Sequence, residues 1–188
     1  MLGKIKNKIF VIAILIMMLA FMGQSTLAYY TTGGIATNVV TTGNIRFIIH
    51  ETTDSGEEYP KDGVYITPGD TVSKQVSFEN DCEHPFYLRA KVVYGIDSEE
   101  LSAEECFKPD IDVENWELYD GWYYYKGIVE PGKTTPHLFS QVEIVGSEMD
   151  NKYLGKQLQI TVVAQAVQSE NNPISDGNTY TASGWPKE

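Results

Sequence analysis

The stretch QLQITVVAQAVQ, residues 157–168, decides the fold because apolar and polar side chains alternate along most of it. The inward set is Leu158, Ile160, Val162, Ala164 and Ala166, and the outward set is Gln157, Gln159, Thr161 and Gln165. Successive side chains of a strand point to opposite faces of a sheet. The pattern therefore predicts an antiparallel strand with one face buried and the other in water.

Similar alternation recurs upstream, in the segments 44–50, 71–79, 86–94 and 138–145. The sequences TPGD at 67–70 and EPGK at 130–133 fit type II turns, with Pro in the second position and Gly in the third. The segment Ser98–Cys106 is the exception and favours one or two helical turns. Together these features predict an all-β chain, a jelly-roll-like antiparallel β-sandwich with a short helical insertion.

The N-terminus has the layout of a secretory signal peptide. Lys4, Lys6 and Lys8 precede an apolar run from Ile9 to Met22, and small residues follow up to Ala28. The run is short for a membrane-spanning helix, which needs about 20 apolar residues. We expect cleavage between Ala28 and Tyr29 and secretion of the mature chain, which would touch the membrane only through the uncleaved leader.

The mature chain is strongly acidic. Removal of 28 of the 188 residues leaves 160, and loss of three lysines changes the formal net charge from −12 to −15. This charge argues against nucleic acid as a partner. We expect an N-terminal segment (29–43), one β-sandwich domain (44–168) and a flexible C-terminal tail (169–188), which is rich in Asn, Ser, Gly and Pro.

The sequence offers no catalytic constellation. His50-Glu51 begins like a zinc-protease helix, but the second histidine of H-E-x-x-H is missing. The stretch from Asp110 to Glu114 begins like a calcium loop and then departs from the EF-hand pattern. We expect no enzyme activity, no metal and no cofactor.

Two cysteines, Cys82 and Cys106, leave two alternatives open. In an exported chain they can form a disulfide that closes a loop of about 25 residues. Otherwise they are two unpaired thiols in separate loops. The spacing in the sequence does not decide between these alternatives.

Four consecutive aromatic residues, Trp122, Tyr123, Tyr124 and Tyr125, form a possible contact face. In a strand, one alternate pair would fill the core and the other would face outward. The outward pair would lie under the loops 51–63 or 98–112, or against a partner.

Several motifs in order resemble the TasA/camelysin family. They are the start AYYTTGGIATNVVTTGNI after the leader, the turn and strand ITPGDTVSKQVSFEN, the block GWYYYKGIVEPGKTTPHLF and the last strand LQITVVAQAVQSEN. The resemblance implies a jelly-roll sandwich, processing by a SipW-type signal peptidase, and assembly into fibres of the biofilm matrix of Gram-positive bacteria. In such fibres the N-terminal segment of one subunit completes a sheet of the next. The camelysin branch implies a surface metallopeptidase, for which this sequence has no zinc motif.

The N-terminal segment suits strand donation. Residues 29–42 carry no charged side chain, and Ile35, Thr37, Val39 and Thr41 alternate with the residues between them. An uncharged extended segment adds well to an open sheet edge. The simpler alternative is that it forms the first strand of its own sandwich. The sequence thus predicts a fibre-forming matrix or surface protein that associates with itself or with other matrix proteins, and the alternative is a monomeric secreted β-sandwich that binds a wall or matrix component.

Overall fold

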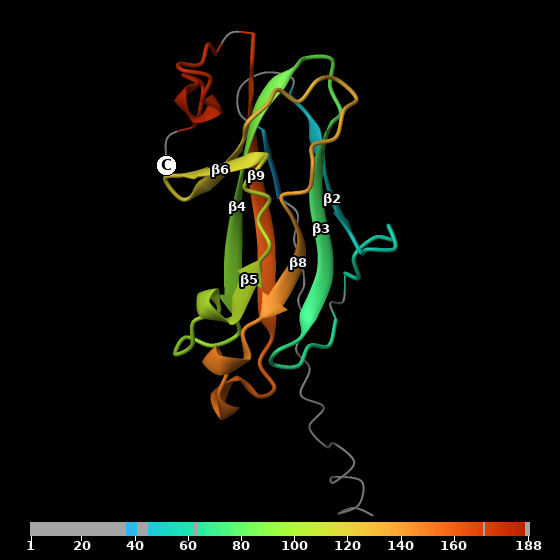
Figure 1. Ribbon diagram of the computed structural model, residues 1–188, viewed down its shortest axis with the longest axis vertical. Helices are drawn as coiled ribbons and strands as arrows, with labels where there is room; N and C mark the ends of the chain where they lie inside the picture. Colours follow the sequence, from blue (N-terminus) through green and yellow to red (C-terminus); the bar gives the residue numbers. More distant parts are fainter. Residues whose placement is uncertain (1–36, 41–44, 62–63, 171, 187–188) are drawn as a thin grey trace, which may run out of the picture.

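The structure is a computed structural model that describes residues 37–40, 45–61, 64–170 and 172–186, with residues 37–40 described by their backbone. Two β-sheets face each other and form a sandwich (Figure 1). The leader, the expected cleavage site at Ala28 and Tyr29, and the expected donor residues Ile35 and Thr41 lie outside the described residues. No helix in the described ranges is long and apolar enough to cross a membrane.

The five-stranded sheet has the strand order β1-β9-β4-β7-β6, and the four-stranded sheet has the order β2-β3-β8-β5. The strands of the five-stranded sheet are β1 (Thr37–Val40), β9 (Leu158–Gln168), β4 (Phe86–Ile96), β7 (Trp122–Tyr125) and β6 (Trp116–Tyr119). The strands of the four-stranded sheet are β2 (Phe47–Thr52), β3 (Thr71–Asn80), β8 (Phe139–Ile144) and β5 (Phe107–Pro109). The expected all-β sandwich is therefore confirmed, while the jelly-roll connections stay a prediction.

The central pair β4–β9 shows why the alternating stretch at 157–168 decides the fold. The two strands pair antiparallel at every position from Phe86–Gln168 to Ile96–Leu158. All five residues of the expected inward set of β9 are at most 1% exposed and lie in the main hydrophobic core. Removal of this apolar surface from water, at about 25 cal/mol per Å², is the main force that holds the two sheets together.

The two expected Pro-Gly turns are also confirmed. Gly69 and Gly132 have φ angles of 94° and 66°, which L-residues with a Cβ rarely adopt. In each turn the fourth residue donates its N–H to the first carbonyl, from Asp70 to Thr67 at 2.9 Å and from Lys133 to Glu130 at 3.0 Å. Both turns lead the chain into or past β3 and so fix its position in the sheet.

The helical insertion is shorter than expected. Between Ser98 and Cys106 the structure has one 3-10 turn, η1 (Glu104–Cys106), and β5 follows it at once. Strands β5 and β6 were not predicted. They have three and four residues, too few to show a period-two pattern in a region rich in acidic residues.

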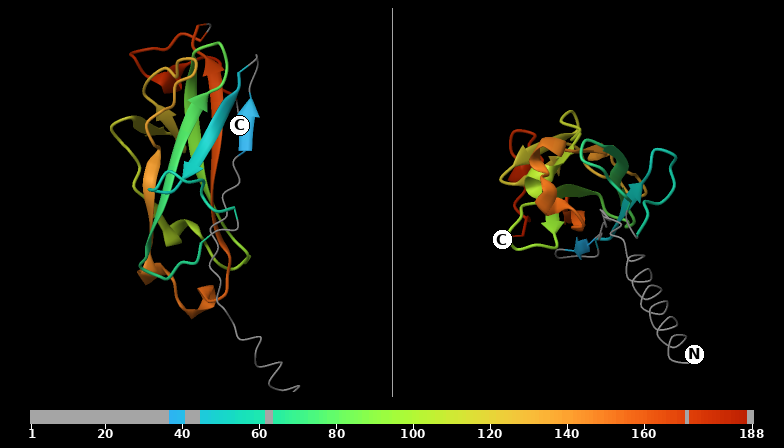
Figure 2. Two further views of the ribbon diagram at one scale, coloured as in Figure 1. Left: turned by 90° about the vertical axis from the view of Figure 1, so that its right-hand side faces the viewer. Right: turned by 90° about the horizontal axis from the view of Figure 1, so that it is seen from below.

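Strand β1 differs from its neighbours in direction. It pairs parallel with β9, from Thr37–Val163 to Val40–Ala166, whereas the other strand pairs are antiparallel. It lies at the edge of the five-stranded sheet, close to β2 (Figure 2). In a single chain, therefore, the residues around Thr37 and Val39 form a strand of their own sandwich. Donation of this strand to a second copy stays a prediction.

The two cysteines do not form a disulfide, which corrects that alternative. Cys82 precedes β4 and Cys106 follows it, and both are free thiols. A strand of this length spans roughly 33 Å, far beyond the Cα separation of about 4.4–6.8 Å that a disulfide requires. Cys106 is fully buried, and burial raises the pKa of its thiol.

Candidate functional site

The aromatic strand β7 sends its side chains to both faces of the sheet, as expected. Tyr123 and Tyr125 pack against the main core between the sheets. Trp122 and Tyr124 point to the outer face and are nevertheless 5% and 3% exposed. The outward pair is therefore covered and does not form an open contact face.

The cover is the C-terminal segment rather than the loops 51–63 or 98–112. Residues 172–186, here called the C-terminal strap, lie against the outer face of the five-stranded sheet near β6 (Figure 1). Trp185 meets Tyr124 edge to face, with ring centroids 5.3 Å apart, and Tyr180 stacks on Tyr119 at 4.2 Å. This packing differs from the flexible tail that its composition suggested.

Hydrogen bonds and a second apolar cluster hold the C-terminal strap in place. Thr179 donates its hydroxyl to the carbonyl of Tyr125 at 2.8 Å, and Trp185 Nε1 donates to the Thr179 carbonyl at 2.9 Å. The cluster is separate from the main core and consists of Tyr87, Val167, Ala182, Ile174 and Trp185. The strap is thus a packed part of the domain.

Arg89 on β4 lies at the centre of this contact and is 6% exposed. Its guanidinium lies between the rings of Trp122 and Trp185, at 4.3 and 5.0 Å from their centroids. It donates to neutral oxygens, which are Gln165 Oε1 at 3.0 and 2.6 Å, the Tyr124 hydroxyl at 2.8 Å and the Pro186 carbonyl at 3.0 Å. A planar guanidinium can bond in its plane and stack on aromatic rings at the same time.

A second buried cation, Lys74 on β3, lies on the other sheet. It is 1% exposed, and its Nζ is 2.8 Å from Glu51 Oε2 and 4.2 Å from the ring centroid of Tyr59. Burial lowers the pKa of Lys74, and the attraction of Glu51 opposes this only in part. Glu51 Oε1 is also buried and accepts no hydrogen bond within the described residues.

A cleft of about 410 Å³ lies along the outer edge of β2. One wall consists of five consecutive residues, Ile48 to Thr52, and the other of residues Glu58 to Lys61. Successive side chains of a strand point to opposite faces, so a cleft on one face would be lined by every second residue. Five consecutive residues line this cleft because it follows the edge of the strand. This cleft is thus open to an extended segment.

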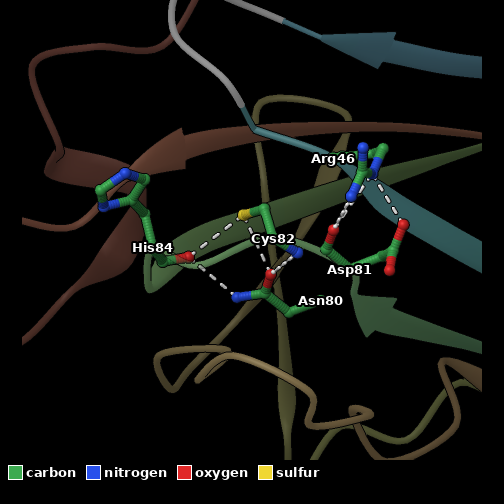
Figure 3. A network of polar contacts seen from close by, with 5 residues as sticks. All are labelled: Arg46, Asn80, Asp81, Cys82 and His84. Atoms are coloured by element: carbon green, nitrogen blue, oxygen red, sulfur yellow. Dashed lines mark hydrogen bonds and ion pairs between the residues drawn. The ribbon is translucent and has the colours of Figure 1, made fainter.

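The turn between β3 and β4 is organised by Asn80, which is fully buried (Figure 3). Asn80 Nδ2 donates to the carbonyls of His84 and Val129 at 2.9 and 2.8 Å, and its Oδ1 accepts from the backbone N–H and the thiol of Cys82. Beside it, the exposed Arg46 pairs with Asp81 at 2.7 Å. Both polar atoms of the Asn80 side chain are engaged by backbone groups of the turn and of Val129, so this network is structural.

The histidines and acidic residues considered as metal ligands are separated or otherwise engaged. His50 on β2 contacts Glu79 at 2.7 Å, while His84 and His137 lie in two separate loops. Asp110 caps the N–H groups of Ser140 and Gln141. Asp112 caps its own loop, and the hydrogen bond from Asn115 lowers its pKa. Among the described residues no group of three His, Cys, Asp or Glu side chains is placed to hold a metal ion.

No protein-family model, no curated protein and no solved structure matches this chain. Two features point to contacts with extended segments, namely the edge strand β1 and the cleft beside β2.

Proposed function

We propose that the chain is a secreted structural protein of the extracellular matrix or cell surface, which assembles into fibres by exchange of its N-terminal segment. Residues 29–42 carry no charged side chain, which suits a segment that leaves water to join a sheet edge. The motifs that resemble those of the TasA/camelysin family support the same function. Processing by a SipW-type signal peptidase would free the segment.

The pairing of β1 is the observation that carries this proposal. β1 pairs with four positions of β9, whereas β9 has eleven residues and pairs with β4 along all of them. When β1 leaves, the edge of β9 is exposed, and the identical segment of a second copy restores the same contacts. Such exchange of an identical element costs little and links one copy to the next.

The binding-module alternative loses the residues on which it depended. Its site would be an open aromatic face on β7, but Tyr123 and Tyr125 pack toward the core. Their outward neighbours are covered by the C-terminal strap. The β1 edge therefore carries the stronger argument.

The proposal is tested with the mature chain, residues 29–188, and two variants, Asn38→Pro and Val39→Pro. In a strand the N–H groups of neighbouring residues point to opposite sides. One of the two prolines therefore removes an N–H that bonds to β9, and the other removes an N–H that points away from β9. Negative-stain electron microscopy at pH 7 and at mildly acidic pH should show filaments from the parent and from one variant. Equal filaments from both variants, and from a chain without residues 29–43, would overturn the proposal.

A further inference from the structure

The outer edge of β2 has backbone groups free to pair with another strand. In β3, the carbonyls of Val76, Phe78 and Asn80 accept hydrogen bonds from the segment before β8, so these positions face away from β2. The residues between them, Ser77 and Glu79, therefore point their backbone groups toward β2, where they lie opposite His50 and Ile48. It follows that the backbone groups of β2 at Phe47, Ile49 and Glu51 point to the outer edge.

The chain itself occupies one end of this edge. After β2 it turns back, forms an antiparallel bridge between Thr52 and Glu58, and donates the N–H of Tyr59 to the carbonyl of Glu51 at 2.8 Å. Residues Glu58 and Tyr59 thus take the position that a neighbouring strand would take. The edge at Glu51 is blocked in this way.

The side chain of Tyr59 holds the returning segment down. It is 6% exposed, and its ring lies over Lys74 Nζ, which in turn pairs with Glu51. We call Tyr59, Lys74 and Glu51 the β2 latch. The latch ties the loop to the strand that it covers, since Glu51 is part of β2 and Lys74 is part of the adjacent strand β3.

Beyond the latch no strand among the described residues pairs with this edge, although β1 lies close to β2. Residues Ile48 to Thr52 and Glu58 to Lys61 line the cleft of about 410 Å³, and Ile48 is 40% exposed. An unpaired edge with an exposed apolar side chain is a template for another strand. The backbone of this edge can pair with a copy of itself: in an antiparallel pair centred on Ile49, Ile49 lies opposite Ile49 and Phe47 lies opposite Glu51.

We propose that β2 is a latent pairing edge for a second copy of this chain, which the β2 latch keeps closed. With the latch in place, the carbonyl of Glu51 is engaged by Tyr59, so two copies can form only the central pair at Ile49. Release of Tyr59 frees the backbone groups of Glu51 in both copies. The antiparallel ladder between the copies can then extend on both sides of the central Ile49 pair. The latch thereby restricts association to the β1 edge and prevents lateral pairing through β2.

The test uses the mature chain with both Asn38→Pro and Val39→Pro, in which exchange of β1 is blocked. In this background Tyr59→Ala should produce a dimer, with self-association at least about tenfold tighter than that of the background chain. Sedimentation velocity over a concentration series measures this change. Tyr65→Ala is the matched control, because Tyr65 belongs to the same part of the chain and is 69% exposed, and it should leave the background state unchanged.

Two further measurements assign the dimer to the edge. Ile49→Pro removes the N–H that points outward and keeps the ladder to β3, so its addition to Tyr59→Ala should restore the monomer. Hydrogen exchange should show that Tyr59→Ala exposes the N–H of residue 59. A chain that stays monomeric although this N–H exchanges freely would overturn the proposal, as would a dimer that persists with Ile49→Pro or a residue 59 that stays protected.

Discussion

Lys74 and Arg89 are two buried cations in the same domain, one on each sheet, and their surroundings differ. Lys74 pairs with a carboxylate, yet burial still lowers its pKa, and Glu51 Oε1 beside it has no hydrogen-bond partner within the described residues. Arg89 donates to neutral oxygens and lies over the indole rings of Trp122 and Trp185. A point charge depends on its counterion, whereas a planar guanidinium can be stabilised by many neutral contacts.

The difference also concerns what each cation holds. Lys74 and Tyr59 fix a loop to the edge of the four-stranded sheet, and Arg89 fixes the C-terminal strap to the face of the five-stranded sheet. The first contact depends on one ion pair, while the second is distributed over several groups. We therefore expect the Lys74 contact to weaken when a charge is removed. We expect the Arg89 contact to weaken when the planar shape of the guanidinium is lost.

The largest effect is expected for Glu51→Ala. It leaves the ammonium of Lys74 buried without a counterion, which costs about 3–5 kcal/mol in the free energy of unfolding. Urea denaturation followed by tryptophan fluorescence measures this loss. The matched control is the double variant Glu51→Leu with Lys74→Met, which removes both charges together and puts apolar side chains in their place, and it should cost less than about 1 kcal/mol or stabilise the fold. Equal losses in the two variants would show that packing, not charge, governs the site.

A smaller effect is expected for Arg89→Lys. The charge remains, but the hydrogen bonds to Gln165, Tyr124 and Pro186 cannot all be made, and we expect a loss of about 2 kcal/mol. The emission of Trp185 should shift to longer wavelength as the C-terminal strap loosens. Arg46→Lys serves as the control, because the Arg46 side chain is 72% exposed in its pair with Asp81 and should change stability by less than about 0.5 kcal/mol. Similar losses at both arginines would remove the contrast between buried and exposed sites.

The smallest effect is a pH dependence that separates the two cations. Because the pKa of Lys74 is lowered in the folded state, the unfolded chain binds more protons between that value and the ordinary 10.5, so stability should rise with pH in this window. Arg89 contributes nothing, since a guanidinium stays charged. Denaturation from pH 8 upward should show this rise in the parent chain and not in Lys74→Met. A rise that persists in Lys74→Met would refute the assignment.

At higher pH a tyrosine should reverse the trend. Burial raises the pKa of Tyr94 to about 12 from its ordinary 10.0, so the unfolded chain releases this proton first. Stability should therefore fall between about pH 10 and pH 12. Tyr94→Phe should reduce this fall, which the same denaturation series measures.

The strands with regular alternation were predictable, and the short ones were not. The pattern at 157–168 gave the inward set of β9 correctly because burial of one face imposes a period of two. The role of the C-terminal strap was missed, since its composition is that of a loop. Trp185 was the available signal, because a lone large aromatic side chain in a polar segment often marks an anchor.

The candidate site was predicted only in its residue types. The sequence indicated that β7 carries aromatic side chains on both faces, but not that Tyr123 and Tyr125 face inward. Because both faces of this strand are aromatic, its pattern is the same in either orientation. The buried positions of Lys74 and Arg89 were also invisible, since their neighbours Glu51, Gln165 and Trp185 are distant in the chain.

The sequence by itself determined the all-β architecture, the central strands and the two Pro-Gly turns, because these depend on local periodicity and on backbone conformation. Tertiary structure alone decided which pair of β7 is covered, that the two cysteines lie at opposite ends of β4, and that β1 runs parallel to β9. It also decided where two positive charges are buried. Each of these outcomes depends on contacts between residues far apart in the chain, which no local pattern records.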